Sequence, residues 1–145
     1  MRNNLKTYRN VDRHSGLAAA DPHTVIVMLF NGVLESLAVA KGAIERRELE
    51  VKSKQINKAV DIFRALQGSL DAENEPEISD NFHNLYEYCI GRLQECSISL
   101  DTSLIDEVVT LFKPIAEAWQ QMPEQAKVEG MEKLNAKKQQ QASLG

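Results

Sequence analysis

The sequence predicts an all-α protein, an antiparallel up-down-up-down bundle of four helices with a flexible N-terminal arm and a polar C-terminal tail. Four segments repeat apolar residues at alternating spacings of three and four, the 3.5-residue period of helices packed side by side. The connections between these segments are short, so successive helices should be antiparallel neighbours. Seven glycines and four prolines leave little material for the turns of an all-β fold.

The first helix is expected over residues 22–47. Asp21 is a suitable N-cap, and Pro22 fits the first helical position because its missing N–H costs nothing there. Residues 25–30 are six apolar residues in a row, more than the single stripe that a surface helix needs. This helix is therefore either central or covered on a second side. Its expected core line is Ile26, Phe30, Val33, Leu37, Ala40 and Ile44.

The second and third helices are expected over residues 54–70 and 80–97, with Ser79 as the cap of the third. Residues 48–53 and 71–78 should form the connections before them. The expected core positions are Ile56, Ala59, Phe63, Leu66 and Leu70 in the second helix and Phe82, Leu85, Cys89, Leu93 and Cys96 in the third.

The fourth helix is expected over residues 102–122, capped by Asp101. Pro114 lies inside it and removes one backbone hydrogen bond. Because the apolar spacing continues past Pro114, we expect a kink near 109–110 and no break. Pro123 should end the helix. The expected core line is Ile105, Val108, Phe112, Ile115, Trp119 and Met122.

The chain is expected to contain one domain, the bundle of residues 21–122. Residues 1–20 should form a flexible arm, in which Leu5 and Tyr8 are spaced so that a helical turn could lie against the bundle. Residues 123–145 are polar and rich in Lys and Gln, and we expect them to be mostly disordered or weakly helical.

Charge and cysteine usage restrict the partners and the compartment. The arm carries a net charge of +3 and the tail +1, so the middle carries −8 of the total of −4. An acidic body offers no basic face to nucleic acid. No apolar run approaches the roughly 20 residues that span a bilayer, so no membrane insertion is expected. Cys89 and Cys96 lie two helical turns apart, too far for a disulfide, which predicts reduced thiols and a cytoplasmic protein.

No arrangement of residues in the sequence points to catalysis, a metal or a cofactor. Asp80 and His83 lie one turn apart, as in carboxylate-bridged metal bundles, but those bundles repeat the pair on a second helix. Here the pair occurs once, and Asp80 is explained as a first-turn residue that favours the helix dipole. We therefore expect no enzyme activity, no metal and no cofactor.

Apolar residues outside the core lines are candidates for a binding surface. Most of them should be the edge of the core, but those left exposed would suit an amphipathic partner helix. Asn31 and Gly32 admit two readings, since Gly32 could permit close approach of a partner backbone or only close helix packing. The surplus apolar residues are Val25, Met28, Leu29, Leu34, Ile62, Ala65, Tyr86, Tyr88, Ile90, Leu104, Val109 and Leu111.

Three motifs resemble one family, the flagellin-specific export chaperones called FliS. The stretch 28–34, Met-Leu-Phe-Asn-Gly-Val-Leu, resembles the signature of its first helix. The stretch 85–93, Leu-Tyr-Glu-Tyr-Cys-Ile-Gly-Arg-Leu, resembles its Leu-Tyr-(Asp/Glu)-Tyr-x-x-x-Arg-Leu helix. Residues 105–108 with Trp119 resemble its last helix. The resemblance covers about residues 8–119, but Phe30 replaces a common Tyr and residues 23–24 replace a common Glu-Glu.

The resemblance implies a cytoplasmic chaperone that binds the disordered C-terminal segment of flagellin one-to-one. It implies further that the chaperone prevents premature polymerisation and delivers flagellin to the cytoplasmic domain of the flagellar type III export gate. Motif positions and surplus apolar positions together give the expected partner-binding residues. They are Leu5, Tyr8, Met28, Leu29, Asn31, Gly32, Ile62, Tyr86, Tyr88, Ile90 and Val109.

Two alternatives stay open at this point. The bundle could be a chaperone of a different secretion cargo. It could also be a homodimeric structural or adaptor protein, in which the surplus apolar stripe is the dimer interface, and weak self-association would fit either reading.

Overall fold

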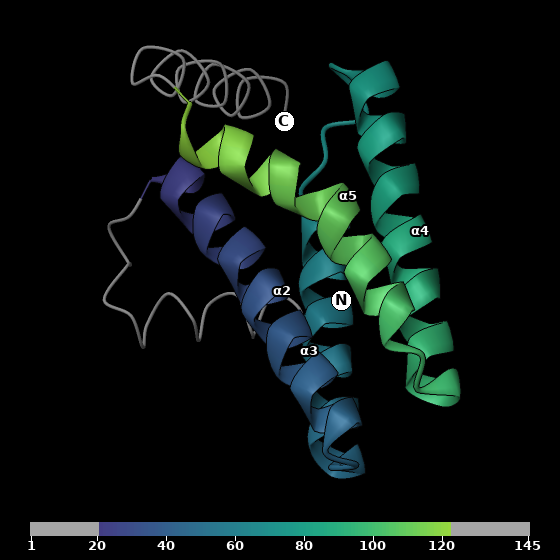
Figure 1. Ribbon diagram of the computed structural model, residues 1–145. Helices are drawn as coiled ribbons and strands as arrows, with labels where there is room; N and C mark the ends of the chain where they lie inside the picture. The colour runs from purple at the N-terminus through teal and green to yellow at the C-terminus, as the bar shows by residue number, and fades with distance from the viewer. Residues whose placement is uncertain (1–20, 123–145) are drawn as a thin grey trace.

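The computed structural model describes residues 21–122, and residues 1–20 and 123–145 lie outside the described part. The described residues form four helices: α2 (Pro22–Glu45), α3 (Leu49–Gly68), α4 (Pro76–Ser99) and α5 (Thr102–Gln120). They alternate in direction, and each packs against its two neighbours in the ring α2, α3, α4, α5 (Figure 1). The predicted all-α up-down-up-down bundle is confirmed. The predictions of a flexible arm and a polar tail lie outside the described residues.

The two predicted aspartate caps are confirmed. Asp21 Oδ1 accepts a 2.7 Å hydrogen bond from the N–H of Thr24, and Pro22 takes the first helical position. Asp101 Oδ1 accepts from both the N–H and the Oγ of Ser103, at 3.0 and 2.7 Å. Each cap satisfies a donor that the first helical turn leaves unpaired, so the starts of α2 and α5 are fixed by local sequence.

The start of the second helix was predicted wrongly, because α3 begins at Leu49 and not at residue 54. The turn before it needs only three residues. Arg47 adopts a left-handed φ of 61° and its N–H donates to Ile44 O, while the N–H of Glu48 donates to Ala43 O. This pattern of two bonds closes a helix end, and glycine usually supplies the left-handed residue. The end of α2 was predicted within two residues, but an arginine in that place did not indicate that the turn would be so short.

The start of the third helix was also predicted wrongly. α4 begins at Pro76, and Ser79 is buried inside its first turn instead of capping it. Glu75 occupies the N-cap position without a side-chain cap bond. Pro76 has the fixed φ that suits a first helical residue, so it begins the helix where a loop was expected.

The fourth helix continues through Pro114 without a break, as predicted. Figure 1 shows that α5 changes direction along its length and that its end lies beside the start of α2. His23 and Trp119 join these two ends. His23 Nε2 donates to Trp119 O at 2.7 Å, Trp119 Nε1 donates to His23 O at 3.3 Å, and the rings stack at 5.3 Å. The end of α5 is therefore held against α2, on the side of the bundle away from the start of α4.

A row of aromatic rings crosses the core. Phe112 contacts Phe30 on one side and Phe63 on the other, with ring centroids 5.0 and 5.2 Å apart. The row continues from Phe63 to Tyr86 and from Tyr86 to Phe82, which is only partly buried. It links all four helices and ends at the α4 surface. Cys89 and Cys96 are buried and unpaired in the same core, as predicted.

Among the described residues, α2 is the helix that is long and apolar enough to cross a membrane by length and composition. The expectation that no segment would reach this threshold was therefore wrong. The same composition suits the central helix of a bundle. Val33, Leu37 and Ala40 are fully buried in the core that α2 shares with the other helices, which favours the second interpretation.

Candidate partner-binding surface

Four of the predicted partner-binding residues belong to the core of the described bundle. Leu29, Ile62, Tyr86 and Ile90 are all buried, and Ile90 is only 1 % exposed. Reading them as surplus apolar residues was wrong, because the neighbouring helix covers them. Their contact with a partner stays a prediction, and so does that of Leu5 and Tyr8, which lie outside the described residues.

Gly32 and Met28, two of the residues predicted on α2, lie at the edge that faces α3, since Gly32 is next to Ile62 of that helix. Val25, Gly32 and Val39 are seven residues apart and so share one line along the helix, and Met28 lies one turn from both Val25 and Gly32. Val25 and Met28 are partly exposed and Val39 is exposed. We call Val25, Met28 and Val39, together with Gly32, the α2/α3 patch.

Gly32 also serves helix packing. A Cβ built at this position would lie 3.2 Å from Cδ1 of Ile62 on α3, a tight contact. The absence of a side chain therefore lets α2 and α3 approach closely here. Of the two readings of Gly32, the packing role is supported by a contact, and the partner role stays a prediction.

A larger group of exposed apolar residues lies on α4 and α5, and the sequence had indicated only Tyr88 and Leu111 of it. Exposed fractions are 52 % for Ile78, 48 % for Tyr88 and 40 % for Leu111, and three further side chains are half-buried beside them. Single exposed apolar residues need no explanation, but several along one pair of helices do. We call this group the α4/α5 patch: Ile78, Phe82, Leu85, Tyr88, Leu111 and Ile115.

The patch is open because α5 leans away from α4. Glu107 of α5 bonds to Tyr88 and Arg92 of α4, which fixes the antiparallel register of the two helices. One and two turns further along α5, Leu111 and Ile115 reach the level of the first half of α4. There α5 turns toward the start of α2, where Trp119 binds His23 (Figure 1). Leu111 is exposed and Ile115 is half-buried.

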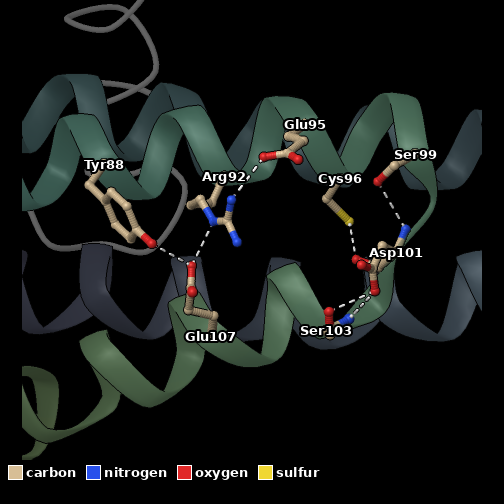
Figure 2. A network of polar contacts seen from close by, with 8 residues as sticks. All are labelled: Tyr88, Arg92, Glu95, Cys96, Ser99, Asp101, Ser103 and Glu107. Carbon is tan, nitrogen blue, oxygen red and sulfur yellow. Dashed lines mark hydrogen bonds and ion pairs between the residues drawn. The ribbon is translucent and has the colours of Figure 1, made fainter.

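A network of polar contacts closes the other half of the same interface (Figure 2). Glu107 Oε1 accepts from the Tyr88 hydroxyl at 2.9 Å and from Arg92 Nε at 2.7 Å. Arg92 also donates to Glu95 Oε2 at 2.9 Å, and its guanidinium lies 5.9 Å from the centre of the Tyr88 ring. The pair Tyr88 and Arg92 thus holds α4 to α5 at the border of the α4/α5 patch.

The charges of this network stabilise one another. Hydrogen bonds from Arg92 and Tyr88 hold the pKa of the Glu107 carboxyl below its usual value. The bond to Glu107 in turn raises the pKa of the Tyr88 hydroxyl and of the Arg92 guanidinium. At neutral pH the carboxylate is therefore charged, the phenol is protonated, and the network is intact.

The predicted residues do not meet in one site. Met28, Asn31 and Gly32 lie on α2, whereas Tyr88 belongs to the α4/α5 patch. Val109 is half-buried on α5 and lies one turn from Asp106, whose carboxylate pairs with Lys41 of α2 at 2.8 Å. Val109 therefore lies at the α5 edge that faces α2. The sequence missed Ile78, Phe82 and Ile115, although the proline in α5 could have indicated that α4 would be partly uncovered.

Within residues 21–122, no group of three or more His, Cys, Asp or Glu side chains is placed to hold a metal ion. Burial raises the pKa of the Cys89 thiol to about 11 and also raises that of Cys96, so both thiols stay protonated at neutral pH.

Comparison with known proteins identifies the family. A family model described as flagellar protein FliS matches residues 3–126. The chain belongs to the FliS family. It is 41 % identical over 115 residues to the flagellar secretion chaperone FliSB of Pseudomonas aeruginosa, covering 79 % of this chain and 91 % of that protein.

Two further relatives are named flagellar secretion chaperone FliS. The protein of Salmonella typhimurium is 36 % identical over 123 residues, covering 84 % of this chain and 91 % of its own. The protein of Vibrio cholerae is 32 % identical over 123 residues, covering 85 % of this chain and 90 % of its own. The names of all three relatives describe secretion chaperones.

Four of the FliS-like motif positions have clear structural roles in this chain. Tyr88 and Arg92 of the third-helix motif join α4 to α5 through Glu107 of the last-helix motif. Phe30 of the first-helix motif packs edge-on against Phe112 and Trp119. Because Phe30 is buried among rings, the missing tyrosine hydroxyl removes no polar contact that the core would require.

Proposed function

We propose that this FliS-family chain binds the disordered C-terminal segment of flagellin in the bacterial cytoplasm, prevents its premature polymerisation and delivers it to the flagellar export gate. The observation that carries the proposal is the presence of two partly exposed apolar patches on opposite sides of the bundle. The α2/α3 and α4/α5 patches border interfaces that do not adjoin in the ring of helices. One short helix cannot cover both, whereas a long segment that wraps around the bundle can.

We infer the contacts of the wrapped flagellin segment from the exposure of the predicted partner-binding residues. Met28, Asn31 and Gly32 are accessible on the α2 side, and Tyr88 is accessible on the α4 side. Four of the predicted residues are buried and would affect binding indirectly, because they set the shape of the surface above them. They are Leu29, Ile62, Tyr86 and Ile90. Val109 is half-buried between α5 and α2 and offers part of its surface. Leu5 and Tyr8 would contribute from the arm.

The energetics suit a chaperone that must release its cargo. Folding on binding typically buries about 1,000–3,000 Å² and spends several kcal/mol on ordering the segment. Apolar burial at about 25 cal/mol per Å² exceeds that cost, and most of the gain is offset by ordering and association. The result is a tight but reversible complex. Reversibility is what delivery to an export gate requires.

The experiment is calorimetric titration of the full chain with the last segment, about forty residues, of the flagellin from the same organism. We expect saturable one-to-one binding with a large negative heat-capacity change, because apolar surface is buried. Leu111→Glu should weaken binding at least about tenfold, since the charge would lose its water in the complex. Met28→Glu should weaken it similarly.

Ile98→Glu is the matched control. Ile98 is 87 % exposed near the far end of α4 and belongs to neither patch, so the same kind of substitution should leave the affinity unchanged. No binding at micromolar concentrations would contradict the flagellin assignment. A stable dimer that ignores flagellin would favour the homodimeric alternative, and capture of another secreted protein would favour a different cargo.

A further inference from the structure

The two halves of α5 are held by different contacts. Before Pro114, Glu107 is hydrogen-bonded to α4 and Asp106 is paired with α2. After Pro114, Trp119 exchanges two hydrogen bonds with His23 in the first turn of α2. The first half is therefore fixed between two helices, whereas these polar contacts of the second half run to α2.

The side of α5 that faces α4 stays apolar beyond the proline. Three apolar residues continue the line of Glu107 at spacings of four, four and three, and they are Leu111, Ile115 and Ala118. Residues at these spacings share one side of a helix, here the side on which Glu107 contacts α4. Leu111 and Ala118 are exposed and Ile115 is half-buried. The second half of α5 thus has a partly exposed apolar side of its own.

The antiparallel register places this apolar side level with the first half of α4. Glu107 bonds to Tyr88 and Arg92. Ile115 lies eight residues further along α5, and Phe82 lies six residues before Tyr88 and ten before Arg92. Because both helices rise by about 1.5 Å per residue, Ile115 and Phe82 stand at the same level. If the second half of α5 continued along α4, it would cover the α4/α5 patch.

Pro114 lets α5 bend without a further loss of helical hydrogen bonds. It has no N–H to donate to the carbonyl of Thr110, so that bond is already missing at the bend. Figure 1 shows that α5 turns toward the start of α2. There the Trp119 ring lies 5.3 Å from the ring of His23 and 6.2 Å from that of Phe30.

The side chain of His23 supplies a large part of this contact. Its Nε2 donates to Trp119 O at 2.7 Å, and its ring stacks on the indole within 11° of parallel. His23 is only 9 % exposed, so the bond is shielded from water and strengthened by the low local dielectric. The bond from Trp119 Nε1 ends on the backbone carbonyl of His23 and does not depend on the imidazole.

We propose that His23 is a positioning residue, which acts through Trp119 to hold the second half of α5 against α2 and so keeps the α4/α5 patch open. Without the imidazole, α5 continues along α4 and lays Ile115 on Phe82. This positioning role stands independently of the cargo. Its consequence for flagellin, which needs the open patch, rests on the proposed function.

The test is the rate at which iodoacetamide alkylates a cysteine placed in the patch by Ile78→Cys, in the full chain and without flagellin. Ile78 is 52 % exposed and lies one turn before Phe82, on the part of α4 that the second half of α5 would cover. We expect His23→Ala to slow alkylation of residue 78 at least about tenfold, because the covered state becomes the main population. A general loss of stability would have the opposite sign, since local opening exposes a thiol and speeds its reaction.

Cys89 and Cys96 of the same chain report whether each variant keeps its fold. Both are buried, and burial raises their pKa values, so they react slowly in the folded protein. Peptide mass spectrometry measures each cysteine separately. His23→Leu is a second variant, which keeps an apolar side chain against Trp119 but has no donor, and it should slow alkylation of residue 78 in the same direction.

Two matched controls separate the His23–Trp119 contact from other effects. His23→Gln keeps an amide N–H that can donate to Trp119 O, so its rate should stay within about twofold of the rate with histidine. Lys41→Ala removes the ion pair with Asp106, a polar contact between α2 and α5 that lies before Pro114, and should leave the rate unchanged.

Equal or faster alkylation of residue 78 in both His23→Ala and His23→Leu, with Cys89 and Cys96 still protected, would overturn the proposal. Slowing by Lys41→Ala as large as that by His23→Ala would also overturn it. Flagellin binding by a chain whose alkylation rate ignores His23 would leave the proposed function intact and remove only the positioning role. Slowed alkylation in a chain that binds no flagellin would do the reverse.

Discussion

The two helix pairs of this bundle are built differently. α2 and α3 share the most extensive interface and are joined by a three-residue turn. Gly32 lets the two helices approach closely, because a Cβ there would lie 3.2 Å from Cδ1 of Ile62. α4 and α5 are held at one half of their interface by the Tyr88–Arg92–Glu107 network, and they separate at the other half.

The difference separates a rigid binding surface from one that can adapt to its partner. The close approach at Gly32 fixes the spacing of α2 and α3, so their surface can change little. The first half of α4 is covered on the α3 side but left open toward α5, and exposed apolar residues gather there. A partner that binds at the α4/α5 patch can add apolar contacts without breaking the packed pair of helices.

The largest effect is expected at the aromatic row that joins the two pairs. Phe63→Ala should reduce the free energy of unfolding by about 3–5 kcal/mol, because Phe63 is fully buried between Phe112 and Tyr86. Phe82→Ala removes the same atoms from the end of the row at the open patch and should cost less than about 2 kcal/mol. Urea unfolding measures both. Equal losses of unfolding free energy would show that Phe82 at the α4 surface is packed as tightly as Phe63 in the core.

A pair of glycine substitutions tests the close approach of α2 to α3. Gly32→Val should destabilise the protein by about 1–3 kcal/mol, since its Cβ alone would lie 3.2 Å from Ile62. Gly91→Val is the matched change on α4, where no atom lies within 4 Å of the new Cβ. There the better helix propensity of valine should raise stability by a few tenths of a kcal/mol. A loss at Gly91 as large as that at Gly32 would contradict the contrast between the pairs.

The smallest effect on stability is expected from a change of pH. It acts on the Tyr88–Arg92–Glu107 network, which holds one half of the α4/α5 interface together. The pKa of Glu107 is lower in the folded protein than its ordinary value of about 4.5. Its contribution to stability is therefore complete above that pH and is lost as the pH falls through the folded-state pKa. Glu107→Gln should be less stable than the wild type at pH 7, and the gap should narrow below pH 4.5.

Urea titrations at pH 7 and at lower pH measure the gap. Glu117→Gln, an exposed change of the same kind on the same helix, is the control for the substitution itself, and its gap is subtracted from that of Glu107→Gln at each pH. A gap for Glu107→Gln that stays constant across this range would mean that the Arg92 and Tyr88 bonds do not stabilise the carboxylate.

The sequence predicted the fold well where the signals are local. Apolar spacing identified four helices, and Asp21 and Asp101 marked two of their starts because their carboxylates bond to the first turn. The other two starts were missed. Arg47 closes α2 in a conformation typical of glycine, and Pro76 begins α4 where Ser79 had seemed the better cap.

The binding surface was predicted less well, because exposure depends on how neighbouring helices cross. Spacing along α4 cannot show that Ile90 is covered while Ile78 and Phe82 lie at an open edge. That distinction arises from the course of α5, which the His23–Trp119 contact holds against α2. The sequence separates these two residues by 96 positions, and no local pattern relates them.

The most direct test of the two-patch proposal is amide hydrogen exchange of the full chain, free and bound to the flagellin C-terminal peptide. We expect slower exchange on binding at two places, the first half of α2 around Met28 and the first half of α4 around Phe82, because a wrapped segment protects both sides. The amides around Ile98 should be unchanged. Protection confined to one side of the bundle, or none in the presence of saturating peptide, would contradict the proposal.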